Sequence, residues 1–251
     1  MFSELIQKFR QDKNLTQSDC VDLLSKRVND LSKLDNVTFS RWENKKTLPT
    51  LTRQFLIMDC LGMLKDYVYF SPKKDILESS VFNKYLNLKF DNEDDVLDCI
   101  SNADKIERVI LNYDDINIDR FVKDYCFDVL DSNFDTFEYK YLVWMSDNKI
   151  NAFLFYYIDT TTESINFFFF ALNKISYKKL FAYLYNEILS YNFDIVNIYT
   201  IGDKEYNLFK KLHGNIVQTL RINNDVVKTK ISFNRMKFLS NKHIFNFYKS
   251  I

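Results

Sequence analysis

The stretch Asp35-Asn36-Val37-Thr38-Phe39-Ser40-Arg41-Trp42-Glu43-Asn44-Lys45-Lys46 is the part of this chain from which a fold can be predicted most directly. Asp35 is a good helix N-cap, and Thr38 follows three residues later in a weak form of the capping box. Phe39 and Trp42 are three residues apart, so they share one face of the helix, and that face must be buried. The stretch therefore predicts a short helix with one apolar face.

The other side chains of this helix suit the edges of DNA bases. Three of them are short and the fourth is a long, forked hydrogen-bond donor: Val37, Thr38, Ser40 and Arg41. Asn44 can take the left-handed conformation that ends a helix, and Lys45 and Lys46 follow where phosphates would lie. Two lysines alone would also fit an ordinary solvated turn.

Further helices are predicted on both sides of this stretch, over residues 3–13, from Thr16 onward and over residues 51–61. Thr16 and Asp19 have the spacing of a capping box at the start of the second helix. Gly62 is placed to end the last helix.

The motifs Leu15-Thr16-Gln17 and Ser40-Arg41-Trp42-Glu43, with their spacing to Pro49 and Leu56, resemble the XRE family of Cro/repressor-type helix-turn-helix domains. The resemblance covers the first quarter of the chain. The chain departs from the family pattern in two places. The connection over residues 29–34 is longer than usual, and Asn44 stands where the family usually has Gly.

The resemblance implies double-stranded DNA as the partner, with nine contact residues: Gln17, Asn36, Val37, Thr38, Ser40, Arg41, Lys45, Lys46 and Thr47. Among them Gln17 would bind a phosphate, and the last three would hold the backbone. Asn36, Val37 and Arg41 would take the base-reading positions, where Arg pairs with guanine and Asn with adenine. The resemblance also implies an internal salt bridge between Arg10 and Glu43.

The composition limits the other functions open to the chain. Its 251 residues include 34 basic and 34 acidic side chains, so the net charge is zero and any basic surface must be local. Residues 1–64 carry 10 Lys and Arg against 8 Asp and Glu, a net charge of +2. The four cysteines lack metal-binding spacing and only two histidines are present, so we expect free thiols and no metal site.

No targeting or membrane-spanning segment is recognised in the sequence. The chain does not begin with a basic and then apolar leader. Its most apolar run, residues 165–172, is far shorter than the roughly 20 residues that cross a bilayer. We therefore expect a soluble, cytoplasmic protein with no membrane partner.

The middle of the chain has weaker patterns. Residues 65–90 are predicted to be a helical connector. The acidic run over residues 91–98 fits the first turn of a helix or, alternatively, a carboxylate metal site. Residues 106–113 fit a strand or a helix, and residues 119–130 an amphipathic helix.

From residue 138 the pattern predicts the order β-β-β-α-β-α-β-β. The strands are expected over residues 139–145, 150–158, 165–172, 195–201, 216–222 and 226–233, and the helices over 176–191 and 204–212. Residues 165–172 are apolar on both faces, which predicts a central strand. This order, with the motif Leu208-Phe209-Lys210-Lys211-Leu212-His213-Gly214-Asn215-Ile216-Val217-Gln218, resembles the GNAT acyltransferase fold.

The expected fold class is α+β with two domains. Residues 1–64 would form an all-α, five-helix helix-turn-helix head, and residues 65–90 a helical connector. Residues 91–251 would form a mixed α/β GNAT-like domain with a mainly antiparallel central sheet.

The GNAT resemblance implies acetyl-CoA as a ligand, but the residues that would bind it differ from the family pattern. The family holds the coenzyme pyrophosphate with a Gly-containing loop before the long helix. Residues 173–179 contain no Gly, and Tyr177 and Lys178 add bulk there. The family's general acid, a Tyr, is replaced by Phe209, although Tyr206 could substitute. We therefore expect no catalytic residues and no bound cofactor.

The sequence thus predicts a DNA-binding transcription regulator with the GNAT-like domain in dimerisation or in sensing a small-molecule or acyl-CoA ligand. A homodimer is expected because a single small head contacts few base pairs. Two alternatives stay open. One is an active N-acyltransferase with a DNA-binding head, and the other is a module that binds a protein instead of DNA.

Overall fold

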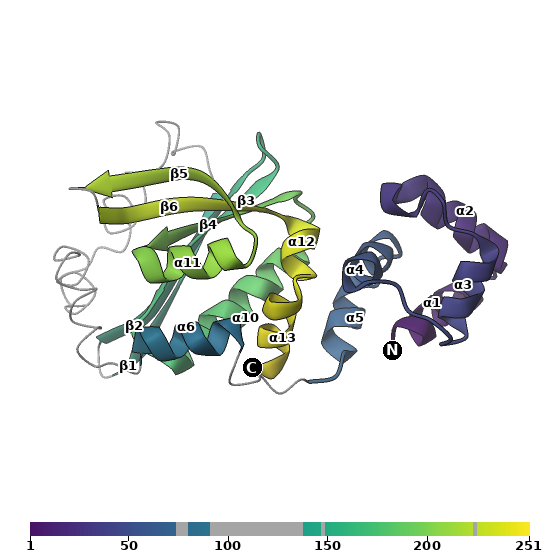
Figure 1. Cartoon of the computed structure of the whole chain (residues 1–251), viewed down its shortest axis with the longest axis horizontal. Helices are drawn as coiled ribbons and strands as arrows, with labels where there is room; N and C mark the ends of the chain where they lie inside the picture. The colour runs from purple at the N-terminus through teal and green to yellow at the C-terminus, as the bar shows by residue number, and fades with distance from the viewer. Residues whose placement is uncertain (74–79, 91–137, 147–148, 223–224) are drawn as a thin grey trace. The chain divides into compact units, whose positions relative to one another are not determined.

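The computed structural model spans residues 1–251 and describes residues 1–73, 80–90, 138–146, 149–222 and 225–251 (Figure 1). The chain divides into two compact units. The first comprises Met1–Lys74 and Met236–Lys249, and the second comprises Asp75–Arg235 and Ser250–Ile251. Residues 91–251 were expected to form one domain, whereas residues 236–249 belong to the first unit. The elements expected over 91–98, 106–113 and 119–130 lie outside the described residues.

Five α-helices form the N-terminal part of the first unit: α1 (Phe2–Asp12), α2 (Gln17–Arg27), α3 (Asn36–Glu43), α4 (Leu51–Cys60) and α5 (Leu64–Phe70). A short 3-10 helix, η1 (Asn29–Leu31), lies in the long connection before α3. The predicted capping box is confirmed, because the Asp19 backbone N–H donates to the Thr16 hydroxyl and the Thr16 N–H donates to the Asp19 carboxylate. Gly62 follows α4 with a φ of 70°, as predicted.

The core of the first unit is aromatic. Phe39 and Trp42 are both buried on α3, as their spacing predicts. Trp42 makes an edge-to-face contact with Phe2 of α1, and Phe55 of α4 makes another with Tyr67 of α5. Burying each of these rings stabilises the unit by roughly 1.5–3 kcal/mol, so the helices are held mainly by their apolar faces.

Two C-terminal helices that the sequence analysis did not predict follow the sheet: α12 (Arg235–Leu239) and α13 (Lys242–Ser250). Phe245 of α13 packs edge-to-face on Phe55 of α4, with ring centroids 5.2 Å apart. The Lys249 ammonium donates to the carbonyls of Val68 and Tyr69, at 3.1 and 3.2 Å, in the last turn of α5. The end of α5 is therefore capped by a side chain from the far end of the chain.

The second unit is built on a six-stranded sheet of β1 (Glu138–Ser146), β2 (Lys149–Asp159), β3 (Ser164–Ala171), β4 (Ile195–Ile201), β5 (Asn215–Ile222) and β6 (Asp225–Asn234). The order across the sheet is β1-β2-β3-β4-β6-β5, and β3–β4 is the parallel pair in it. The predicted order of elements is confirmed, and so is the interior position of β3. Asn197 of β4 donates to Asn166 of β3 at 2.9 Å, a buried bond that fixes the register of the parallel pair.

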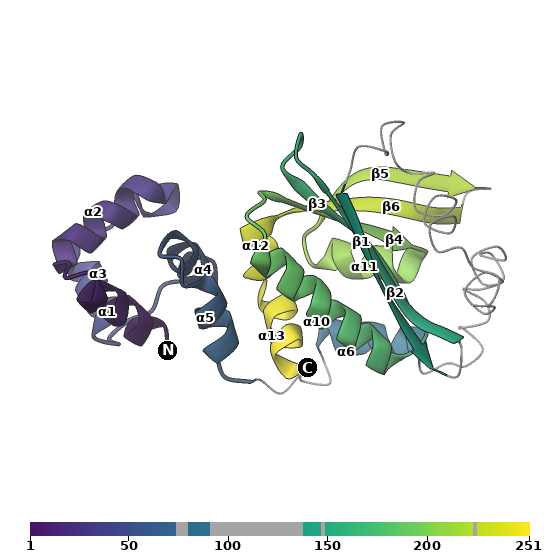
Figure 2. The same ribbon diagram turned by 180° about the vertical axis from the view of Figure 1, so that it is seen from behind.

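Three helices lie against this sheet: α6 (Val81–Phe90), α10 (Lys174–Ser190) and α11 (Asp203–Lys211) (Figure 2). Phe169 of β3 contacts both Tyr177 of α10 and Phe209 of α11, so these two helices cover the same face. Tyr85 joins α6 to this layer through its ring contact with Tyr177. The chain is therefore α+β, with a mixed and mainly antiparallel sheet, as expected.

Within the part of the chain that the structure describes, no helix is long and apolar enough to cross a bilayer.

Candidate nucleic-acid interface

The start of α3 is fixed by its own cap. The Asp35 carboxylate accepts the backbone N–H of Thr38 at 2.6 Å, and Asp35 itself has extended backbone angles. This hydrogen bond from Thr38 lowers the pKa of Asp35 below its usual range, because it stabilises the charged form. The first two residues of the helix, Asn36 and Val37, are exposed to solvent as a result.

The end of α3 is a Schellman motif with an unusual residue at its left-handed position. The N–H of Lys46 donates to the Arg41 carbonyl at 2.8 Å, and the N–H of Lys45 donates to the Trp42 carbonyl at 3.2 Å. Lys45 has a φ of 60°, whereas Asn44 has a φ of −85°. The prediction that Asn44 takes the left-handed conformation is therefore wrong by one residue. Instead, the Asn44 amide donates to the Ser40 carbonyl at 2.9 Å.

The buried side of α3 is tied to α1 and α2 through one carboxylate. Glu43 is 7% exposed, and its Oε1 accepts the Arg10 Nε–H at 2.6 Å, which confirms the predicted salt bridge. Its Oε2 accepts a hydrogen bond from the Gln17 amide, the group expected to bind a phosphate. Both oxygens of a buried carboxylate are thereby paired, as burial of a charge requires.

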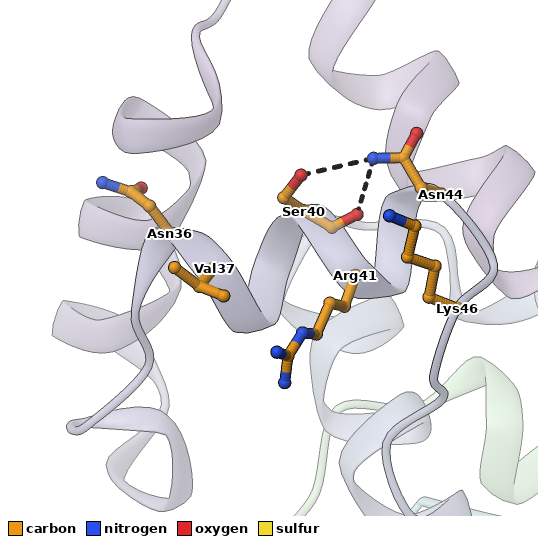
Figure 3. Close-up of a pocket in the computed structure, with 6 residues that line it drawn as sticks. All are labelled: Asn36, Val37, Ser40, Arg41, Asn44 and Lys46. Carbon is orange, nitrogen blue, oxygen red and sulfur yellow. Dashed lines mark hydrogen bonds between the residues drawn. The ribbon is translucent and has the colours of Figure 1, made fainter.

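The opposite side of α3 forms a surface hollow of about 330 Å³, shown in Figure 3. Six residues line it: Asn36, Val37, Ser40, Arg41, Asn44 and Lys46. Five of these are among the nine predicted contacts. The sixth, Asn44, was predicted only to end the helix. Gln17, Thr38, Lys45 and Thr47 are not among the lining residues.

The positive charge of this surface comes from two residues. Within the described ranges, the side chains of Arg41 and Lys46 have no hydrogen bond or ion pair. Lys45, in contrast, binds Glu4 of α1 at 2.6 Å, and Glu4 also accepts the N-terminal amine at 3.0 Å. The ammonium of Lys45, followed by the amine, lowers the pKa of Glu4 to about 2, so the Glu4 carboxylate is charged at neutral pH.

Side chains of residues 173–179, which the GNAT resemblance aligns with a pyrophosphate-binding loop, make contacts within their own unit. The Asn173 side chain accepts the N–H of Ser176 at 2.9 Å and so occupies one of the free donors at the start of α10. Tyr177 is buried, and its ring packs against Phe169 and Tyr85. Phe209, which the GNAT resemblance would align with a general acid, is also buried. Tyr206 is half-buried, with the Lys210 ammonium 5.5 Å from its ring.

The described residues contain no metal cluster, and comparisons with known proteins add no assignment. In the residues that the structure describes, no three His, Cys, Asp or Glu side chains gather where they could hold a metal ion. The acidic run over residues 91–98 lies outside those residues. A scan of the chain against protein-family models and searches of curated proteins and of solved structures find no match.

Proposed function

We propose that the protein is a sequence-specific DNA-binding transcription regulator in which α3 enters the major groove. The observation that carries the proposal is the hollow on α3, where Asn36, Ser40 and Arg41 present hydrogen-bonding groups to solvent. Such side chains on one helix match the donor and acceptor pattern of base edges. The resemblance to XRE-type domains supports the same partner.

The packing behind α3 supports this proposal because base contacts need a fixed helix. Phe39 and Trp42 anchor α3 in the core, and Glu43 joins it to Arg10 and Gln17. In this arrangement Gln17 has a structural role. Its remaining amide hydrogen is the donor left to approach a phosphate.

Substitution of Arg41 and of Lys46 separates base contacts from backbone contacts. Arg41→Ala should weaken the preferred duplex by about 1–3 kcal/mol and relax the sequence preference. Lys46→Ala should weaken all duplexes evenly and reduce the salt slope by about 0.9. Lys8→Ala, a change of equal charge at an exposed position on α1, is the matched control. Kd values for preferred and unrelated duplexes at several salt concentrations give all three results.

An equal loss on every duplex for Arg41→Ala would remove its base-reading role. A folded protein that retards no DNA at all would instead favour the protein-binding alternative.

For the second unit we propose a role in dimerisation or ligand sensing and no acyl transfer. The order of its strands and helices supports the GNAT-like description. The capped start of α10 and the buried ring of Tyr177 argue against a pyrophosphate there. Calorimetry with acetyl-CoA tests this, because micromolar binding would favour the acyltransferase alternative. Sedimentation of the full chain tests the dimer, and a monomer at the concentrations that bind DNA would contradict it.

A further inference from the structure

One lining residue of the hollow is not explained by the folding of α3. Of the six described residues around the hollow, five are polar or charged and Val37 is apolar. Its side chain is 61% exposed, so it contributes little to the core. Val is also a poorer helix former than Ala, Gln or Lys. Neither packing nor helix propensity therefore accounts for an aliphatic side chain at this position.

Val37 lies one turn before Arg41, on the same side of α3 (Figure 3). A helix rises about 1.5 Å per residue, so the two residues are separated by about 6 Å along its axis. Base pairs are spaced about 3.4 Å apart, and 6 Å therefore corresponds to roughly two base-pair steps. If Arg41 binds guanine O6 and N7, Val37 lies against a neighbouring base pair.

The major groove offers one apolar group on its base edges, the C5-methyl of thymine, which cytosine lacks. The branched Val side chain has a restricted χ1 angle, so little rotamer freedom is lost on contact. We propose that Val37 binds the C5-methyl group of a thymine, within two base pairs of the G·C pair bound by Arg41. The inference rests on the proposed function, in which α3 occupies the major groove.

Ile175 of α10 provides a natural comparison for Val37. It is also the second residue of a helix with an Asx cap, and its side chain is 68% exposed. Exposure at this helix position is therefore not sufficient evidence for a contact. Val37 differs because it lines the same hollow as Arg41, Asn36 and Lys46, whose side chains suit contacts with DNA. Ile175→Ala is accordingly a matched control.

The test uses the full chain and duplexes selected from a random pool. Each thymine of the selected sequence is replaced in turn by deoxyuridine, which removes only the C5-methyl group. For the wild type, one position in each half-site should lose about fourfold in affinity, the value expected for one buried methyl group. In Val37→Ala, which lacks both γ-methyl groups, that loss should be much smaller, whereas Val37→Thr, which keeps one γ-methyl group, and Ile175→Ala should retain it.

Two results overturn the inference in distinguishable ways. Selected sites without a thymine within two base pairs of the guanine, or an equal deoxyuridine effect in wild type and Val37→Ala, would refute the methyl contact and leave DNA binding intact. A pool that yields no enriched sequence would refute the proposed function together with this inference.

Discussion

Helices α3 and α10 begin with the same pattern of residue types but differ in how much of their second turn is buried. In Asp35–Phe39 and in Asn173–Tyr177 an Asx cap is followed by a polar residue, a β-branched residue, a hydroxyl residue and an aromatic ring. In both helices the cap accepts the N–H of the hydroxyl residue, at 2.6 and 2.9 Å. In both, the β-branched side chain is exposed and the ring is buried.

The two helices diverge in the next turn. In α3 it contains Ser40 and Arg41, and the helix ends at Glu43, so a polar side remains open to solvent. In α10 the chain buries Leu180 and Phe181 and continues to Ser190. The first residues of each helix thus provide a cap and one buried ring. The side chains of the following turn determine whether that side of the helix is accessible to a ligand.

The largest expected effect comes from removing the anchoring ring of α10. Tyr177→Ala should lower the free energy of unfolding by about 4 kcal/mol, because it empties a fully buried aromatic site. Urea denaturation measures the loss. Ile175→Ala, two residues away and exposed, should change it by no more than about 0.5 kcal/mol. A small loss for Tyr177→Ala would mean that this ring is not an anchor and that the loop can open.

Glu43→Ala tests the corresponding anchor of α3. Arg10 and Gln17 both lose their acceptor, so the free energy of unfolding should fall by about 2–3 kcal/mol. This loss is smaller than for a fully buried ion pair, because the Arg10 side chain is 24% exposed. DNA affinity should fall with it, since α3 is no longer held. Unchanged thermal stability in scanning calorimetry would contradict this role.

The cap of α3 should show a pH dependence that the cap of α10 lacks. The pKa of Asp35 is lowered in the folded protein, so its charge stabilises the fold above the unfolded pKa of about 3.9. That contribution is lost as the pH falls through the folded pKa. The wild type should therefore melt above Asp35→Asn at pH 6, with the difference closing below about pH 4.

Asn173→Asp is the reciprocal variant, since it gives α10 the cap of α3. Above about pH 4 its melting temperature should be higher than that of the wild type, and this difference should disappear in acid. A difference between Asp35→Asn and wild type that is constant with pH would show that the charge of Asp35 does not matter.

The smallest effect is expected at Glu4, outside both helices. Glu4→Gln removes the partner of Lys45, which then becomes available to a phosphate. Affinity for preferred and unrelated DNA should rise by the same factor, and the salt slope should steepen by about 0.9. Fluorescence anisotropy over a salt series measures both. An increase in affinity for the preferred duplex alone would indicate that Lys45 contacts a base and not a phosphate.

The parts of this structure that follow from local sequence could be predicted, and those that depend on distant partners could not. Asp35 and the Phe39–Trp42 spacing act within one helix, so they give its start and its buried side. The left-handed conformation of Lys45 could not be predicted, because Lys is disfavoured in that conformation. It is stabilised by the hydrogen bonds of the whole Schellman motif at the end of α3. The XRE resemblance implies a phosphate contact for Gln17, and its hydrogen bond to Glu43 could not be predicted because that bond depends on how α2 packs on α3.

The return of α13 to the first unit has a consequence for protein synthesis. Phe245 and Lys249 complete the packing of Phe55 and the cap on α5, yet they leave the ribosome after the entire sheet has been made. At about 5–20 residues per second, α1 to α5 wait roughly 10–35 s before this partner is available. Within this chain, the helices that are translated first are therefore completed only after the sheet, and their apolar contact surface for α13 stays uncovered in the meantime.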